Sequence, residues 1–316
     1  MTDTDWPRIA VVGAGAVGSY FGGLLARAGA PVVLIGRKPM VEAVRSDGLV
    51  IETSGSQFRI EVDATTDVAA VRDASLVLFC VKSQDTESAA RDIGPFFDRD
   101  NARLLCLQNG VDNVDRIRAT GGIEALPAAV YVGVSVSAPG RIKHVGRGDL
   151  TLPKSEETKP LSETFQRAGI PCRVSDNIVG EMWVKLLCNA ALNAISALGR
   201  IRYGAIAADP DARNLMRQVV DEVRNVAGAA DVAMPNIDSS DAGMAAALQI
   251  ATQMESAFSS TAQDLQRGRR TEIDSLNGYV ARRGAELGVS TSVNYALYAL
   301  VKLSEKADGG LSEIRV

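Results

Sequence analysis

The chain has 316 residues, of which 46% are hydrophobic and 23% charged, and its formal net charge is −4. This composition is typical of a soluble globular protein, and the length predicts two domains. Because the charge is negative and no basic run occurs, nucleic acid is not an expected partner. Four scattered cysteines and a single histidine, His144, argue against a metal site or a disulfide framework and favour a cytoplasmic location.

Residues 9–26 are apolar enough to resemble a membrane span. They carry glycines in patterned positions and follow two acidic residues, Asp3 and Asp5, without a stop-transfer signal. These features are unlike those of a signal peptide or a transmembrane helix, so we expect no membrane association.

The same segment predicts a dinucleotide site. Residues 8–12 form a β-prone run and residues 19–28 have the composition of a helix. Between them the chain reads Gly13-Ala14-Gly15-Ala16-Val17-Gly18. Strand, Gly-x-Gly-x-x-Gly and helix is the order that lets the backbone approach a pyrophosphate at a helix N-terminus. A bare βαβ turn or an FAD site is the alternative.

The end of the next strand, residues 31–35, selects between nicotinamide cofactors. NAD sites usually place a carboxylate there for the ribose 2′-hydroxyl. Here Arg37 and Lys38 follow instead, and no acid occurs until Glu42. A guanidinium pairs well with a 2′-phosphate, so the sequence predicts NADP(H) rather than NAD. The alternative is that both cations belong to the solvated surface.

Two later strands end in polar residues. Residues 76–81 and 103–107 are continuous apolar runs, as buried parallel strands are, and they lead into Lys82 and into Gln108-Asn109-Gly110. Ligands bind at the carboxyl edge of such sheets. We therefore expect Lys82 and Asn109 beside the cofactor, although either can be a simple turn residue.

The remaining strands of the first half are expected in two groups. Residues 49–53 and 57–62 predict a hairpin, and further strands are expected at residues 128–137, 141–145, 149–152 and 171–174. His144 falls in one of these strands and is expected to be structural or exposed. Strand signals nearly vanish after residue 175, and residues 177–199, 212–230, 242–267, 272–287 and 293–306 are helical. The prediction is an α/β protein in which a Rossmann domain, residues 1–175, precedes an all-α domain, residues 176–316.

The first of these helices is apolar all round except for one stripe. Lys185, Asn189 and Asn193 recur at i, i+4 and i+8 and so share a face. An exposed face is one interpretation. Because apolar residues flank the stripe on both sides, we favour the wall of a polar cleft, where the lysine can donate a proton and the amides can hold a small polar ligand.

Two further polar residues belong to a later segment. On one straight helix Ser260 and Glu272 would point about 120° apart, at ~100° per residue. They can share a site only if the chain bends near Gly268. Taken alone, the segment is a charged surface turn.

Taken together, these motifs resemble the ketopantoate reductase family. The resemblance rests on GAGAVG, VKS, QNG, EMWVKLLCNAALN and SSTAQDLQRGRRTEID with its following LNG, in that order, and covers nearly the whole chain. It implies a Rossmann domain, a helical domain, and NADPH-dependent reduction of ketopantoate to D-pantoate for pantothenate and coenzyme A synthesis.

The resemblance also implies roles. Lys185 would be the general acid and Glu272 its partner at the substrate hydroxyl, also near the cofactor. Asn109, Asn189, Asn193 and Ser260 would bind substrate, with Asn109 also touching cofactor. Arg37 and Lys82 would be cofactor ligands together with the glycine loop, Gly13, Ala14, Gly15, Ala16, Val17 and Gly18.

This chain departs from some relatives at two places where they carry asparagine. Here the positions read Arg202-Tyr203-Gly204 and Ala257. One alternative is therefore a paralogue that reduces another 2-oxo acid. A non-catalytic NADP(H) sensor is an alternative of a different class, and the proton donor Lys185 with its polar neighbours argues against it. A small-molecule 2-oxo acid is the expected partner, and the chain is expected to be a monomer or a homodimer.

Overall fold

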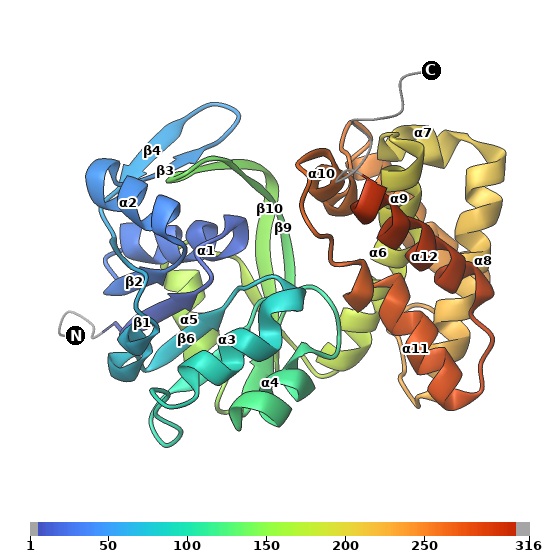
Figure 1. Cartoon of the computed structure of the whole chain (residues 1–316). Coiled ribbons are helices and arrows are strands. Elements are labelled where there is room, and N and C mark those ends of the chain that lie inside the picture. Colours follow the sequence, from blue (N-terminus) through green and yellow to red (C-terminus); the bar gives the residue numbers. More distant parts are fainter. Residues whose placement is uncertain (1–5, 308–316) are drawn as a thin grey trace. The chain divides into compact units, whose positions relative to one another are not determined.

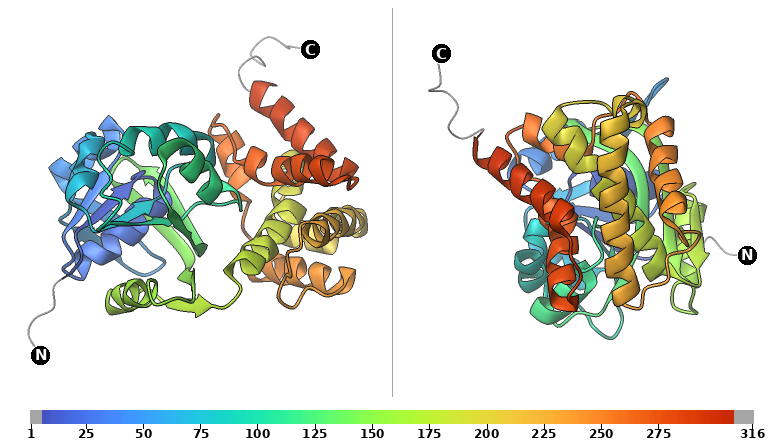
Figure 2. Two further views of the ribbon diagram at one scale, coloured as in Figure 1. Left: turned by 90° about the horizontal axis from the view of Figure 1, so that it is seen from below. Right: turned by 90° about the vertical axis from the view of Figure 1, so that its right-hand side faces the viewer.

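The computed structural model describes residues 6–307, which form two compact units (Figures 1 and 2). The first unit ends at Ile178 and the second begins at Val179. The first is α/β and the second is built from helices, which confirms the predicted fold class.

A six-stranded parallel sheet forms the centre of the first unit. Its order is β5-β2-β1-β6-β7-β8, and each neighbouring pair runs parallel. Its four central strands are short runs rich in Val, Ile and Leu, the composition expected where both faces are buried. The six strands are β1 (Ile9–Val12), β2 (Val32–Ile35), β5 (Asp63–Thr65), β6 (Leu76–Phe79), β7 (Arg103–Cys106) and β8 (Ala125–Pro127).

The two faces of this sheet pack against different layers. Because side chains alternate along a strand, Ile9 and Val11 join a core that includes Phe21 of helix α1 (Ala16–Arg27), whereas Ala10 and Val12 join a core on the opposite face. That opposite core includes residues of α3 (Thr86–Ile93) and α4 (Asn113–Gly121).

A second sheet lies beyond α1. Its path is β11-β10-β3-β4, with β9 paired to β10. Strands β3 (Leu49–Glu52) and β4 (Gln57–Ile60) pair antiparallel, which confirms the predicted hairpin. β9 (Ala129–Ala138) and β10 (Arg141–Pro153) form one long antiparallel ribbon with three irregularities in register, where two separate strands were expected after Gly140. β11 (Cys172–Ser175) completes the sheet.

The expected position of His144 is confirmed. It lies in β10 and is half-buried, and its ring stacks on that of Tyr20 of α1 with ring centroids 4.7 Å apart. The other elements of the first unit are α2 (Lys38–Asp47), α5 (Lys159–Arg167) and the short 3₁₀ turns η1 (Val68–Asp73) and η2 (Ser83–Asp85).

Helices form the second unit. They are α6 (Ile178–Gly199), α7 (Tyr203–Ala208), α8 (Pro210–Ala229), α9 (Ser240–Gln253), α10 (Ser260–Gln266), α11 (Asn277–Leu287) and α12 (Ser292–Ala307), with a 3₁₀ turn η3 (Ile273–Ser275) before α11.

Two predicted helices were wrong in their extent. The single helix expected over residues 242–267 is two helices, because Ser259 caps a new one: its hydroxyl accepts the N–H of Ala262. The helix expected from residue 272 begins at Asn277, after η3. Gly268, with φ of +61°, lies between these pieces, at the predicted bend.

Helix α6 is the one segment of residues 6–307 that is long and apolar enough to span a membrane. The stretch that meets this test is 67% buried inside the protein. Burial of this extent is typical of a core helix. Residues 9–26, which also resembled a span, form β1, the glycine turn and nearly all of α1.

Candidate functional site

The glycine loop lies between β1 and α1, at the carboxyl edge of the parallel sheet. Gly13 has φ of +98°, and a Cβ at this position would lie 2.6 Å from the Val81 nitrogen. A Cβ on Gly18 would collide with the Gly13 carbonyl oxygen. The first and third glycines of the motif are therefore required by backbone geometry and close packing.

The middle glycine leaves space instead. A Cβ on Gly15 would meet nothing within 4 Å, and Gly15 is exposed. Helix α1 begins at the next residue with no side-chain cap and no acidic residue in its first turn. The first N–H groups of a helix have no partner within it. This end of α1 is consequently an open cradle suited to a phosphate-bearing group.

The turn after β2 lies beside this loop. A Cβ on Gly36 would lie 2.8 Å from the Cβ of Ala14. Arg37 follows, and its side chain is 89% exposed. Its Nη2 lies 3.4 Å from Oδ2 of Asp85, and Lys38 Nζ lies 3.7 Å from Oε1 of Glu42. Arg37 and Lys38, the two cations that the sequence places after this strand, are therefore each paired with a carboxylate.

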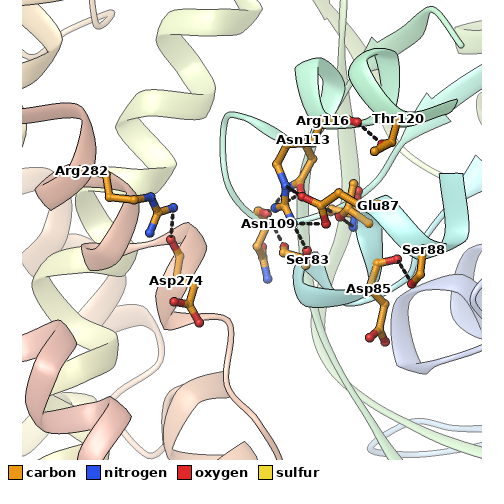
Figure 3. A network of polar contacts seen from close by, with 12 residues as sticks. Ser83, Asp85, Glu87, Ser88, Asn109, Asn113, Arg116, Thr120, Asp274 and Arg282 are labelled. Carbon is orange, nitrogen blue, oxygen red and sulfur yellow. Dashed lines mark hydrogen bonds and ion pairs between the residues drawn. The ribbon is translucent and has the colours of Figure 1, made fainter. Parts of the chain in front are cut away.

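A network of buried polar groups fixes the turns that carry Lys82 and Asn109 (Figure 3). The backbone carbonyl of Asn109 accepts hydrogen bonds from Asn113 Nδ2 at 2.7 Å and from the Ser83 hydroxyl at 3.0 Å. The Thr86 hydroxyl donates to Asn113 Oδ1 at 3.0 Å. Ser83, Thr86 and Asn113 are buried, so the turns after β6 and β7 are held to one another.

Gln108 and Arg116 complete this network. Gln108 Nε2 donates to the Val81 carbonyl at 3.0 Å and to Thr86 Oγ1 at 2.8 Å. Arg116 Nη2 donates to the Ser83 carbonyl at 2.6 Å, and its guanidinium forms two bonds with Glu87 at 2.7 and 2.8 Å. The hydrogen bond from Arg116 lowers the pKa of Glu87.

The polar stripe of α6 is neither fully exposed nor fully buried. Lys185 and Asn189 are half-buried, and Asn193 is buried. The side-chain oxygen of Asn193 accepts a hydrogen bond at 2.8 Å from the hydroxyl of Tyr203, at the start of α7. The intermediate burial disfavours an ordinary exposed face for this stripe.

Two segments of the second unit are tied directly to the backbone of α6. The Ser259 hydroxyl donates to the Asn193 carbonyl at 3.0 Å, and Asn277 Nδ2 donates to the Ala190 carbonyl at 3.1 Å. Ser259 immediately precedes Ser260, and Asn277 begins α11. These bonds attach the residue before Ser260 and the segment after Glu272 to the helix that carries the polar stripe.

The turn around Glu272 is held mainly by α12. Thr271 donates to Oε1 of Glu305 from its N–H at 2.8 Å and from its hydroxyl at 2.6 Å. Lys302 Nζ lies 2.7 Å from Glu305 and 3.0 Å from Asp274. Burial alone lowers the pKa of Lys302, but the bonds to these two carboxylates hold it above its ordinary value. Figure 3 shows a further bond, from Arg282 to the Asp274 carbonyl.

The two places where the sequence was expected to depart from some relatives are in contact. The N–H of Tyr203 donates to the Ala257 carbonyl at 3.0 Å, and Gly204 donates to the Glu255 carbonyl at 3.0 Å. The Arg202 guanidinium donates to the Ser256 carbonyl and lies 4.8 Å from the centroid of the Phe258 ring. This pair of segments forms one surface next to Asn193.

Sequence reasoning missed several residues of this arrangement. Asp85, Asn113, Arg116, Tyr203 and Glu305 carry no motif, and their importance follows from contacts between segments distant along the chain. Asp85, Asn113 and Tyr203 stood near a signal, as neighbours of the VKS motif, of the QNG motif and of an expected family departure. Among the described residues no group of three or more His, Cys, Asp or Glu is placed to hold a metal ion.

The chain matches known proteins over nearly its full length. Residues 9–157 match the family described as Ketopantoate reductase PanE/ApbA, and residues 177–305 match its C-terminal part. A Pyrococcus horikoshii protein named 2-dehydropantoate 2-reductase is 34% identical over 96% of this chain and 99% of its own length. A protein of that name from Halobacterium salinarum is 33% identical over 95% and 99%.

Solved structures agree with this assignment. A PanE/ApbA family ketopantoate reductase from Ralstonia eutropha JMP134 has a TM-score of 0.89 and 43% identity over 95% of this chain and 99% of its own. D-mandelate dehydrogenase with NADH and anilino(oxo)acetate has a TM-score of 0.87 at 24% identity, which shows the shared fold. The chain belongs to the ketopantoate reductase family.

Proposed function

We propose that this protein is an NADPH-dependent reductase of 2-oxo acids, with ketopantoate as substrate and D-pantoate, a precursor in pantothenate and coenzyme A synthesis, as product. Family membership supports an oxidoreductase that uses a nicotinamide cofactor and acts on a CH–OH group. The observation that carries the proposal in this chain is the polar stripe of α6, which is partly or fully buried among apolar residues. The backbone of the same helix accepts hydrogen bonds from Ser259, next to Ser260, and from Asn277, in the segment that follows Glu272.

The cradle at Gly15 fits a pyrophosphate, and Arg37 beside it fits a 2′-phosphate. Residues that would hold the cofactor are the loop Gly13, Ala14, Gly15, Ala16, Val17 and Gly18, together with Arg37, Lys82, Asn109 and Glu272. A bound NADPH supplies the hydride that reduces the C2 ketone.

The protein's own groups supply orientation and the proton. Lys185 donates a proton to the developing alkoxide oxygen, and its ammonium charge stabilises that oxygen as negative charge builds. Glu272 holds the lysine and the substrate hydroxyl. The substrate is bound by Asn109, Asn189, Asn193 and Ser260.

Tyr203 gives a specific reason to keep a second substrate in view. Its hydroxyl donates a hydrogen bond to the side-chain oxygen of Asn193, and Arg202 and Phe258 lie on the adjoining segments. An amide that is already bonded to a phenol offers a substrate hydroxyl one acceptor fewer. A reductase for another branched or aromatic 2-oxo acid is therefore the second candidate.

Absorbance decay of NADPH with purified protein and a panel of 2-oxo acids tests both candidates. Ketopantoate turnover with a kcat/KM well above that for 2-oxoisovalerate and phenylpyruvate supports the first. A reversed order supports the second. If NADPH binds but no 2-oxo acid is reduced, the reductase proposal is wrong and a nucleotide-sensing role replaces it.

A further inference from the structure

The carboxylate that the sequence lacks after β2 is supplied by a different part of the chain. Asp85 is 48 residues from Arg37, yet its Oδ2 lies 3.4 Å from Arg37 Nη2. The contact follows from topology, because β2 and β6 both pair with β1 and their carboxyl ends share one edge of the sheet. The turns that follow these strands thus meet beside the glycine loop.

The Asp85 backbone is fixed by its neighbours. Its N–H donates to the Lys82 carbonyl at 2.8 Å, and its carbonyl accepts the Ser88 hydroxyl at 3.0 Å. Ser83 and Thr86, on either side, are buried. The carboxylate itself is 41% exposed and points away from Ser88 in Figure 3. Asp85 therefore presents a positioned acceptor to solvent, with Arg37 as its partner.

The charge of this region differs from what the sequence alone indicates. Arg37 is balanced by Asp85, and Lys38 by Glu42. A carboxylate accepts hydrogen bonds from a ribose 2′-hydroxyl, whereas a guanidinium pairs with a 2′-phosphate. Asp85 and Arg37 provide one group of each kind at one place.

We propose that Asp85 determines cofactor specificity: it accepts a hydrogen bond from the 2′-hydroxyl of NADH, and it competes with the 2′-phosphate of NADPH for Arg37. The protein then binds both nucleotides, with a modest preference for NADPH. The inference rests on the dinucleotide site of the proposed function, but not on the identity of the 2-oxo acid or on the role of Lys185.

The test measures the dissociation constants of NADPH and NADH for the wild type and for Asp85→Asn. Binding is monitored through nucleotide fluorescence, with no 2-oxo acid present. The substitution keeps the size of the side chain and removes its charge. We expect the ratio of the NADH to the NADPH dissociation constant to rise about tenfold, because the 2′-phosphate gains an uncontested guanidinium and loses a repelling carboxylate. A ratio that changes less than twofold, or that falls, overturns the proposal.

Glu42→Gln is the matched control, since it removes one negative charge from the neighbouring Lys38 pair. We expect it to change the ratio less than threefold, and an effect equal to that of Asp85→Asn would assign the result to general charge and overturn the proposal. Turnover of 2-oxo acids is measured separately. A protein that binds both nucleotides but reduces none of the acids would refute the proposed reductase activity. The effect of Asp85→Asn on nucleotide binding could still be interpreted, because it is measured without a 2-oxo acid.

Discussion

The two units hold their candidate site residues in place by different chemistry. In the first unit, the turns that carry Lys82 and Asn109 are fixed mainly by buried neutral groups, namely the side chains of Ser83, Thr86 and Asn113. In the second unit, the turn around Glu272 is fixed by carboxylates and a lysine on α12 and η3. There Thr271 bonds to Glu305, and Lys302 bonds to both Glu305 and Asp274.

This difference has consequences for how each region responds to change. Neutral hydrogen bonds between buried groups are insensitive to salt and to pH, but a missing member leaves its partners unsatisfied in the interior. A network of charges tolerates a lost bond better when it is partly solvated, and it depends on ionisation. We therefore expect substitutions in the first region mainly to lower the free energy of unfolding, and substitutions in the second mainly to lower kcat.

The largest effect is expected at the proposed proton donor. Lys185→Ala should lower kcat by roughly 10²–10⁴-fold, the usual contribution of a general acid, while the dissociation constant for NADPH stays within threefold. Single-turnover kinetics and nucleotide fluorescence measure the two quantities. Lys306→Ala, at an exposed lysine of the same unit, is the control and should match the wild type. Near-normal turnover by a folded Lys185→Ala variant would remove the lysine from the mechanism.

The next effect concerns the neutral network of the first unit. Asn113→Ala removes the acceptor of the Thr86 hydroxyl and a donor to the Asn109 carbonyl, in a buried site. We expect unfolding free energy to fall by about 2–3 kcal/mol and nucleotide affinity to weaken. Denaturant titration and fluorescence binding check this. Asn101→Ala, at an exposed asparagine bonded to Asp98, should cost far less; equal losses would show that the buried network has no special role.

The carboxylate network of the second unit should behave differently. Glu305→Gln keeps the shape of the side chain but weakens its bonds to Thr271 and Lys302. The turn around Glu272 is then held less firmly in one conformation. We expect kcat to fall about tenfold with the NADPH dissociation constant unchanged, which marks Glu305 as a positioning residue. Steady-state kinetics with a separate binding titration give this split. Glu286→Gln, on α11, removes an exposed carboxylate that pairs with the half-buried Arg283 and should change neither quantity. A lower NADPH affinity in Glu305→Gln would contradict the proposed division between the units.

The glycine loop, the strand edges and the α6 stripe were predictable because each depends on a local pattern. Gly13 needs its positive φ and Gly18 its close packing whatever the rest of the chain does, and Lys185, Asn189 and Asn193 share a face through helical periodicity alone. Asp85 and Glu305 were not predictable. Their partners, Arg37 and Thr271, lie 48 and 34 residues away, and only the order of the strands and the packing of α12 bring them together.

Helix boundaries that depend on tertiary contacts could not be predicted from the sequence either. The residues from 242 to 267 have helical composition throughout, and the break before α10 depends on Ser259, whose hydroxyl both caps that helix and bonds to α6. A serine within an apolar helical pattern is too common to predict a break. The second contact, to the Asn193 carbonyl, exists only in the folded unit and explains why the chain divides here.

The smallest effect is expected at the ion pair between Arg116 and Glu87, which adjoins the neutral network. Arg116 lowers the pKa of Glu87 in the folded protein, so the pair stabilises the protein when pH lies above the unfolded pKa, about 4.3, and this contribution is lost as pH falls through the lower folded value. Since both side chains are partly exposed, Glu87→Gln should cost less than about 1 kcal/mol at pH 7. The difference from the wild type should shrink as pH falls from 7 towards 3, because the wild-type carboxylate is increasingly protonated and the pair with Arg116 is lost. Denaturant titrations at pH 7, 5 and 3 measure it, with Glu124→Gln, at a more exposed pair with Arg118, as the control. A cost above that of Asn113→Ala would mean that charge, and not the buried amide, holds the turns of Lys82 and Asn109.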